Sequence, residues 1–554
     1  WDRHQDQWRW AEFKEDDKII YKPVPRDRDQ AFSIFSDGFL MNVITTIIPD
    51  LKGMRSYEES LKNPESFNLS GYPLDMRLIK EATKLDWDAQ VKIIQRQITD
   101  EIIESAFLKF PKEVSDETID VIKRKLKGRR RNLQKISDSY FVHLNKFQVI
   151  TGTDKDDWFE INRFKNGDTE IIGYRIKGGK KADIFHKRRY KKDVTQDIWI
   201  YGLDDDDYFV INGIAGKRPI KIKIIGGLNN DIYEIDTPKA VIVYDYKSKK
   251  NTFITKNFKK RITDDYKTNT YHYKKLKNKS NLTSPTVWFN PDDGVKLGVT
   301  NTILVNDFER NPFTAKHVIK GSYFTATNGY EIKYNGEFAH IIKDWNLGFK
   351  AQFNSPNYAI NFFGYGNNSF NPQSEENENR DYNRVRIRKA IAGTFLKWQG
   401  ELGAKITFAA NFQNFDIEKT SNRFLETQYA AENSIFKAQS FFNTEARYHY
   451  KHEDNPAFTT LGLTFDALLG HTRNLNKINN FSYATSSIAI THKLIPSGKL
   501  VIASKVNGYF TFGNNFEFYQ GATIGGKKGL RSYRNERFTG KNAFYHSTDL
   551  RYNI

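Results

Sequence analysis

From about residue 295 to the C-terminus, the chain repeats segments of about ten residues in which apolar and polar side chains alternate strictly. In YEIKYNGEF (330–338), the apolar face carries Tyr330, Ile332, Tyr334 and Phe338. The same period recurs in WNLGFKAQF (345–353), AKITFAANF (404–412) and TLGLTFDALL (460–469). A period of two predicts β-strands with unlike faces, and about ten residues are enough for a tilted strand to cross a membrane.

Twelve strands are expected in this part of the chain. Their ranges are about 295–306, 316–328, 330–341, 345–355, 357–366, 384–398, 401–415, 438–452, 458–471, 481–495, 499–513 and 543–553. Every second connection is predicted to be tight: Asn328-Gly329, Ser355-Pro356, Gln399-Gly400, Glu453 to Pro456, and Pro496 to Gly498. Most of the others are long and polar, such as 369–383, 416–437 and 514–542.

Short turns at one end and long loops at the other are typical of outer-membrane barrels, with periplasmic turns and surface loops. A soluble β-sandwich also alternates, and it is the alternative reading, but it has no reason to separate its connections by length. The pattern therefore favours a transmembrane antiparallel β-barrel.

Composition sets the limits for the rest of the chain. The 554 residues suggest two to four domains. Lys and Arg (86) exceed Asp and Glu (67) by 19, but they are spread along the chain. The dense run KRKLKGRRRN (123–132) carries helix signals and is expected to be a solvated surface, so nucleic acid is not an expected partner. Cysteine is absent, which excludes disulfides and thiolate metal sites. No apolar run approaches the length of a transmembrane helix.

Two further regions precede the barrel. Residues 75–146 are expected to be helical, because apolar residues recur every three to five positions in DAQVKIIQRQITDEIIESAFLKF, namely Val91, Ile94, Ile98, Ile102 and Phe107. Pro111 ends that pattern, and Ser115 with Asp116 and Glu117 starts a new helix. The expected domains are a helical segment (1–146), a β-rich soluble domain (147–285) and the barrel (286–554).

The β-rich domain contains two acidic turns, in IYGLDDDDYFVI (200–211) and KIIGGLNNDIYEI (223–235). The second resembles the RTX nonapeptide, whose consecutive turns sandwich Ca²⁺, with Asn229 in place of a glycine. That resemblance implies calcium at Asp205, Asp207, Asn229 and Asp231. The copies are far apart and imperfect, so stacked turns do not follow from the sequence, and the alternative is an ordinary acidic β-turn between strands.

The longest connection, 514–542, contains YQGATIGGKKGLRSYRNERFTG. Here the chain resembles the BamA/TamA outer-membrane assembly superfamily, also called bacterial surface antigen proteins. Barrels of that family have sixteen strands, and the loop between strands eleven and twelve carries a Val/Leu-Arg-Gly-Phe/Tyr motif. Leu530-Arg531-Ser532-Tyr533 falls in the corresponding loop, with Ser532 where the family has glycine. NPDDGVKLG (290–298) and NFFGYGN (361–367) also resemble Bacteroidetes-type members of this family.

The resemblance implies that the loop folds into the lumen and that Arg531 meets an acidic group there. Asp549 on the expected twelfth strand is the favoured partner, and an ordinary surface arginine is the alternative. It also implies about twelve of sixteen strands, so we expect the chain to be incomplete at its C-terminus.

The chain opens with WDRHQDQWRW, which resembles the catalytic loop of atypical kinases of the CotH and secretory-pathway casein kinase type. By that resemblance Asp2 is the catalytic base, Gln7 lies beside the metal, and Asp27 or Asp29 binds Mg²⁺. The 1–146 segment would then be a kinase-like C-lobe that lacks its nucleotide lobe, because that lobe would precede Trp1. The alternative is a charged turn held by packing of Trp1, Trp8 and Trp10, or an inactive remnant.

Two functions remain open. By resemblance, the barrel inserts or translocates proteins at the bacterial outer membrane, with lipid, client outer-membrane proteins or accessory lipoproteins as partners and the soluble part in the periplasm. The other is an envelope phosphotransferase for which the barrel is only an anchor. No repeated pattern typical of POTRA domains is evident before the barrel, which weakens the first reading.

Overall fold

The computed structural model describes residues 3–552 except 17, 28–30, 33–37, 39–40, 43–44, 46–55, 62, 112, 114–115, 291, 370–380, 401, 430–432 and 527. The chain forms two compact units, Trp1–Lys277 and Asn278–Ile554. Asp2 and Asp29 of the kinase-like motif, and Ser115, lie outside the described residues. None of the described helices is long and apolar enough to cross a membrane.

The first unit begins with an antiparallel hairpin and continues with helices. The hairpin consists of β1 (Trp8–Glu15) and β2 (Lys18–Pro25) after a short 3-10 helix (Gln5–Gln7). The helices are α2 (Pro64–Phe67), α3 (Tyr72–Leu78), α4 (Lys84–Gln97), α5 (Asp100–Phe107), α6 (Glu117–Arg131) and α7 (Leu133–Asn145). The expectation of helices before residue 146 is therefore confirmed.

The helical pattern predicted from Val91 to Phe107 is interrupted before Pro111, because the chain breaks after Gln97 into α4 and α5. Thr99 caps α5 by accepting a hydrogen bond from the Ile102 amide, 3.3 Å away. Of the predicted apolar stripe, Val91 is buried, whereas Ile94, Ile98 and Ile102 are exposed and Ile103 is buried in place of Ile102.

The basic run at 123–132 lies largely on α6, whose charges pair with carboxylates. Glu104 of α5 accepts from Lys123 (3.1 Å) and Lys127 (2.6 Å). Arg130 lies 2.7 Å from Asp100. These ion pairs join α6 to α5 and offset part of the positive charge of the run.

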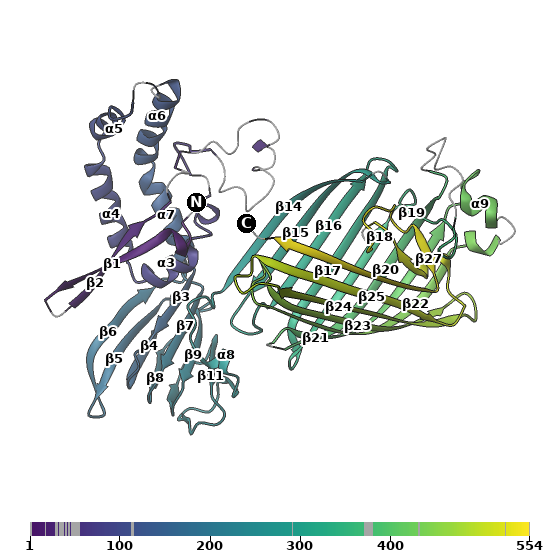
Figure 1. The fold of residues 1–554 in the computed structure, drawn as a ribbon. Coiled ribbons are helices and arrows are strands. Elements are labelled where there is room, and N and C mark those ends of the chain that lie inside the picture. The colour runs from purple at the N-terminus through teal and green to yellow at the C-terminus, as the bar shows by residue number, and fades with distance from the viewer. Residues whose placement is uncertain are drawn as a thin grey trace. The chain divides into compact units, whose positions relative to one another are not determined.

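The rest of the first unit is a coil of short strands that alternates between two sheets (Figure 1). One sheet has five parallel strands: β3 (Phe147–Thr151), β7 (Asp197–Leu203), β9 (Lys221–Gly227), β11 (Val241–Asp245) and β13 (Lys259–Ile262). The other joins in parallel β4 (Asp157–Arg163), β8 (Tyr208–Gly213), β10 (Ile232–Ile235) and β12 (Thr252–Phe253). An antiparallel extension of this sheet, β5 (Thr169–Lys177) and β6 (Lys180–Tyr190), and the short helix α8 (Tyr266–Asn269) complete the unit.

The two sheets enclose a core of isoleucines and aromatic rings that repeats from coil to coil. Phe159, Phe209, Tyr233 and Phe253 stack in one column, with ring centroids 5.2 to 5.3 Å apart. Each ring occupies the same position of its strand, so neighbouring coils are in register. The turns that the sequence left unplaced are therefore stacked on one another.

The second unit is one antiparallel sheet whose strands follow each other in chain order, in a strongly curved arrangement (Figure 1). Its strands are β14 (Asn278–Asn290), β15 (Gly294–Asn306), β16 (Ala315–Phe324), β17 (Gly329–Ile342), β18 (Trp345–Asn354), β20 (Arg384–Gln399), β21 (Ala404–Ile417), β22 (Gln439–Glu453), β23 (Leu461–Asn474), β24 (Asn480–Lys493), β25 (Leu500–Phe512) and β28 (Asn542–Tyr552). The expectation of a long antiparallel meander is confirmed.

Two of the strand predictions are wrong: one strand was missed and another was predicted too long. The two errors leave the number of strands before the loop unchanged. β14 was missed because its first half is polar and it contains Pro285, which an end strand of the sheet order tolerates. The expected strand at 357–366 shrinks to β19 (Ala359–Asn361), which pairs only with β20, and Gly364 and Gly366 follow it with positive φ. The loop with Arg531 consequently still lies between the eleventh and twelfth strands of the main path.

The tight turns are also distributed differently from the expectation. Because neighbouring strands are antiparallel, successive connections alternate between the two ends of the sheet. Residues 325–328, 355–369 and 381–383 therefore lie at the same end as the described residues of the loop 513–541, here called the loop end. The opposite end has the connections 307–314, 343–344, 400–403, 454–460 and 494–499.

Candidate functional site

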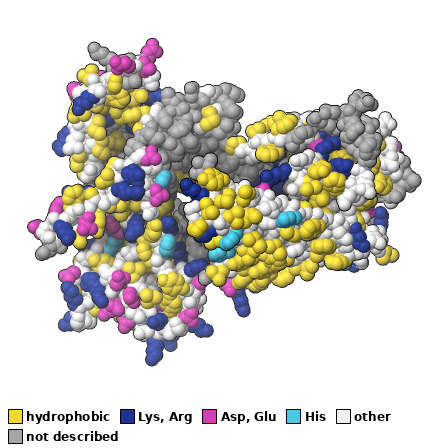
Figure 2. Space-filling view, in the orientation of Figure 1, with side chains coloured by type: hydrophobic (Ala, Val, Ile, Leu, Met, Phe, Trp, Pro, Cys, Tyr) yellow, Lys and Arg dark blue, Asp and Glu magenta, His cyan; other side chains and the backbone are white. Residues whose placement is uncertain are grey.

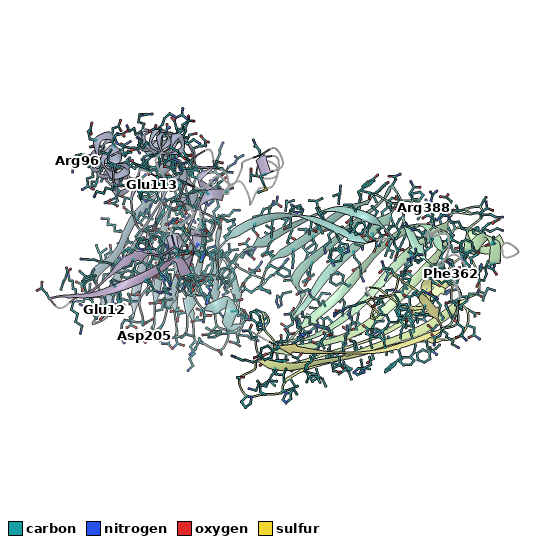
Figure 3. The ribbon with its side chains drawn as sticks, turned by 45° about the horizontal axis from the view of Figure 1, so that its top comes forward. Glu12, Arg96, Glu113, Asp205, Phe362 and Arg388 are labelled. Atoms are coloured by element: carbon teal, nitrogen blue, oxygen red, sulfur yellow. The ribbon has the colours of Figure 1, made fainter. Side chains whose placement is uncertain are left out.

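The loop 513–541 folds back and is held at the loop end of the sheet. It contains a short 3-10 helix (Phe518–Gln520) and a small hairpin formed by β26 (Ala522–Ile524) and β27 (Phe538–Gly540). Phe518 is buried and its ring lies 4.6 Å from that of Phe362, which is labelled in Figure 3. Both belong to an apolar cluster with residues of β20, β21 and β22, the helix α9 (Phe424–Tyr429) and the turn Asn433–Phe436. The loop is therefore fixed by burial of apolar surface.

Arg534 supplies the polar part of this anchor. Its Nε and Nη2 donate to Asp292 Oδ1 at 2.8 and 2.6 Å, and Asp292, in the turn between β14 and β15, is buried. Asn361 donates to Asp292 Oδ2 at 3.0 Å and to the Asn535 carbonyl at 3.0 Å. Glu536 accepts from the Asn361 amide at 3.1 Å. Three segments far apart in the sequence are thus tied together by one buried network.

The residues predicted from the motif lie next to this network. Leu530 accepts from the Gly526 amide at 2.8 Å, and the Tyr533 ring packs 5.3 Å from Phe538. Arg531 Nη2 lies 3.9 Å from Asp549 Oδ2 on β28, as favoured, but the Arg531 side chain is 88% exposed. Ser532 is exposed in the same turn. Three residues beyond the motif, Arg534 of the same loop has a buried carboxylate partner, and no sequence signal distinguished it.

The stacked turns of the first unit form two ladders of side-chain to backbone hydrogen bonds. In the inner ladder, each backbone amide donates to the side chain at the same position of the next coil. Asp157 donates to Asp207 Oδ1 (2.8 Å), Asp207 to Asp231 Oδ1 (2.9 Å), and Asp231 to Asn251 Oδ1 (2.9 Å). In the outer ladder, each backbone amide donates to a side chain of the preceding coil. Asp206 donates to Asp156 (3.1 Å), Asn230 to Asp206 (3.0 Å), and Lys250 to Asn230 (2.9 Å). The acidic turns therefore hold the coils in register.

The four predicted calcium residues fall into two groups. Asp207 and Asp231 are buried in the inner ladder, whereas Asp205 (Figure 3) lies in the turn 3.7 Å from Lys155, and Asn229 donates to Asp204 at 3.2 Å. Ca²⁺ takes about six to eight oxygen ligands. Within the described ranges, no group of three or more His, Asp or Glu side chains is arranged to hold a metal ion. In this arrangement Asp207 and Asp231 accept the backbone hydrogen bonds of the inner ladder.

The inner ladder places carboxyl groups where charge is costly. The Oδ2 atoms of Asp207 and Asp231 are buried and accept no hydrogen bond from the described residues. Burial, with the nearby Asp231 charge, raises the pKa of Asp207 to about 10. Burial also raises the pKa of Asp231, which faces Asp245, and raises the pKa of Asp245 to about 6. A proton on Asp207 is therefore part of the folded unit at neutral pH.

The N-terminal motif is only partly described, but two of its residues meet. β1 pairs Trp8 with Pro25 of β2, so the residues just outside the hairpin are neighbours. Gln7 is buried and its Nε2 donates to Asp27 Oδ2 at 3.2 Å. Arg3 instead binds the buried Asp75 of α3, with Nη1 2.9 Å from Asp75 Oδ1. Sequence reasoning did not anticipate Asp75, which also accepts from Tyr140 of α7 at 2.5 Å.

Comparisons with known proteins give the following results. No family model matches the chain, and a search of curated proteins finds no match. Solved structures that match include BamA from Haemophilus ducreyi lacking POTRA domains 1–3 (16% identity, TM-score 0.34, 47% of this chain and 47% of that chain) and CdiB from Acinetobacter baumannii (13%, 0.31, 50% and 47%). OmpT of Vibrio cholerae also matches (6%, 0.28, 49% and 76%).

The chain spans about half the length of the BamA and CdiB structures. TM-scores this low carry no argument about fold or function. The statements on fold and on function therefore depend on the strand order, the burial pattern and the contacts of this chain.

Proposed function

We propose that the second unit is the wall of a β-barrel in the outer membrane of a bacterium, and that the protein inserts or translocates other proteins there. The observation that carries the membrane location is an inverted burial pattern. On β17, Glu331 is 8% exposed while the adjacent Ile332 is 50% exposed, and on β22, Asn443 is 1% exposed while Phe442 is 45% exposed. In water, such an apolar outer face would be unfavourable, whereas hydrocarbon stabilises it.

The pattern extends over the sheet. Exposed apolar side chains of the outer face gather on the visible side of the second unit in Figure 2. Among all strands of the unit, the exposed apolar residues of the outer face include Leu297, Val299, Ile319, Phe349, Phe408, Leu463, Ile490, Phe510 and Phe544. Every strand between β14 and β28 is paired on both sides, as the hydrogen-bonding of backbone groups in lipid requires, and the two end strands β14 and β28 are each paired on one side.

The insertion or translocation role is argued from the loop 513–541 and not from the fold, since fold alone does not determine function. The support is the anchored loop 513–541, in which Arg534 and Phe518 hold an inward-folded segment beside the motif 530–533. Depleting the protein in its native cells should lower the abundance of other outer-membrane proteins, measured by quantitative proteomics of membrane fractions. Unchanged abundance of every other outer-membrane protein would contradict this role.

A second candidate is a phosphotransferase anchored by the barrel. The observation that favours it is the Gln7–Asp27 contact at the base of the hairpin, where the kinase resemblance places a metal-side amide and a Mg²⁺ ligand. We expect the two functions to separate in the same depletion experiment, because a phosphotransferase would change the phosphorylation of envelope proteins at constant abundance. Replacing Asp27 with Asn should reproduce that change if the site is active.

A further inference from the structure

The inner face of the second unit, defined as the face that carries the buried polar side chains such as Glu331 and Asn443, contains a cavity of about 350 Å³. Most of the residues that line the cavity are neighbours on the inner face of adjacent strands, as the strand register shows. Lys320 of β16 lies opposite Lys333 of β17, which lies opposite Gln352 of β18. The next row brings Asn335 opposite Lys350. Asn411, Gln413 and Glu445 line the far side.

The cavity has an excess of positive charge. Three of its lining residues are lysines, Lys320, Lys333 and Lys350, and Glu445 is the one carboxylate among the described lining residues. Lys333 pairs with Glu331 at 2.8 Å. Lys350 lies 4.0 Å from Glu445, whose other oxygen accepts from Asn443 (3.0 Å) and Tyr483 (2.9 Å). Lys320 lies directly opposite Lys333, and like charges in this position destabilise a sheet, an effect that Glu331 offsets for Lys333 but that leaves the Lys320 charge for a bound anion.

We propose that this cavity binds the phosphate group of a small soluble anion. Its volume is within the range of small-molecule sites, about 300–1,000 Å³. Three ammonium groups with amide side chains between them supply several N–H donors and keep one net positive charge beside Glu331 and Glu445. Several donors suit the three or more acceptor oxygens of a phosphate better than the two of a carboxylate. The site depends on the geometry of the sheet and not on whether the protein inserts other proteins.

The test uses the full chain in detergent and inorganic pyrophosphate as the probe, titrated calorimetrically in 150 mM NaCl so that simple screening is already present. Because each variant removes one charged N–H donor, Lys320→Gln and Lys350→Gln should each weaken binding on the order of tenfold or more. Lys505→Gln is the matched control, because Lys505 lies on β25 of the same sheet, outside the cavity, and should change binding less than about twofold.

Two further arms identify the source of the anion. Nanodiscs containing phosphatidic acid present the same chemistry as a lipid headgroup, and an oligoglutamate peptide presents carboxylates. The proposal is supported if the Lys320→Gln/Lys350→Gln double variant loses pyrophosphate binding and if neither the nanodiscs nor the peptide displaces pyrophosphate from the wild type. It is overturned if the folded wild type binds no pyrophosphate, if the double variant binds it equally, or if only the lipid or the peptide competes. Heat-modifiable migration of each variant on gels verifies folding.

Discussion

At the scale of single residues, two arginines three positions apart have different roles. Arg534 donates to the buried Asp292, whereas Arg531 is 88% exposed beside Asp549. Removing one partner of a buried ion pair costs about 3–5 kcal/mol, while an exposed pair is worth about 0–1 kcal/mol. We therefore expect Arg534→Ala to loosen the loop 513–541 strongly and Arg531→Ala to loosen it little.

Protease accessibility of this loop on intact cells measures the difference. Arg534→Lys should restore protection only partly, since an ammonium cannot donate through two N–H groups in the planar arrangement of a guanidinium. If Arg531→Ala opened the loop as much as Arg534→Ala, the anchoring role assigned to Arg534 would be wrong.

Asp207 allows a second residue-scale prediction, on pH. Its pKa in the folded unit, about 10, lies above the value of about 3.9 for an unfolded chain, so folding favours the protonated form. The stability that this proton contributes is complete below about pH 4 and is lost as the pH rises towards 10. The urea midpoint of the first unit, followed by pulse proteolysis, should therefore be lower at pH 8.5 than at pH 5.5.

Asp207→Asn separates this explanation from calcium binding. An amide can accept the Asp157 N–H as Asn251 accepts that of Asp231, and it carries no charge, so the variant should flatten the pH dependence without unfolding the unit. Asp207→Ala, which leaves that N–H unpaired, should cost about 1–3 kcal/mol. A wild-type midpoint that rises markedly with Ca²⁺ and falls with a chelator, with Asp207→Asn insensitive to both, would favour the calcium site instead.

At the scale of elements, the stacked coils depend on a glycine at each corner. A Cβ on Gly226 would overlap Asp231 Oδ2 and the Tyr233 hydroxyl and lie 2.7 Å from Asp245 Oδ2. Gly226→Ala should therefore separate the coil formed by β9 and β10 from its neighbours and lower the free energy of unfolding by about 1–3 kcal/mol through overpacking. Gly178→Ala is a useful control, because open space surrounds that position and only its backbone conformation is affected. Equal urea midpoints for both variants would argue against close packing at the corner.

At the scale of the whole molecule, the inverted burial pattern predicts opposite tolerance of charge on the two faces of one strand. Arginine in place of Ile332, on the outer face of β17, should disfavour membrane insertion by about 2–4 kcal/mol if that position lies near the bilayer midplane. Arginine in place of Asn335, on the inner face three residues later, should be tolerated. The measurement is the fraction of protein that migrates in the heat-modifiable, folded form after reconstitution. Equal folding of the two variants would contradict the assignment of the faces.

How far the sequence predicts this structure depends on the range of the interactions involved. Alternation in segments such as 330–338 identified most strands of the meander, because each strand has one apolar and one polar face whatever its neighbours are. Thr99 and its capping signal were overlooked, since an apolar stripe ran on across the break. β14 escaped notice because Pro285 interrupts its pattern, and only its place at the end of the sheet order makes that proline tolerable.

By itself, the sequence determined the antiparallel meander, its two unlike faces and the loop that carries residues 530–533, since these depend on local periodicity and turn residues. Tertiary structure decided which partners meet. The stacking of Asp157, Asp207 and Asp231, the contact of Gln7 with Asp27, and the choice of Arg534 over Arg531 join positions 20 to 242 residues apart. No local pattern encodes such contacts, because they depend on how complete sheets register and where loops return.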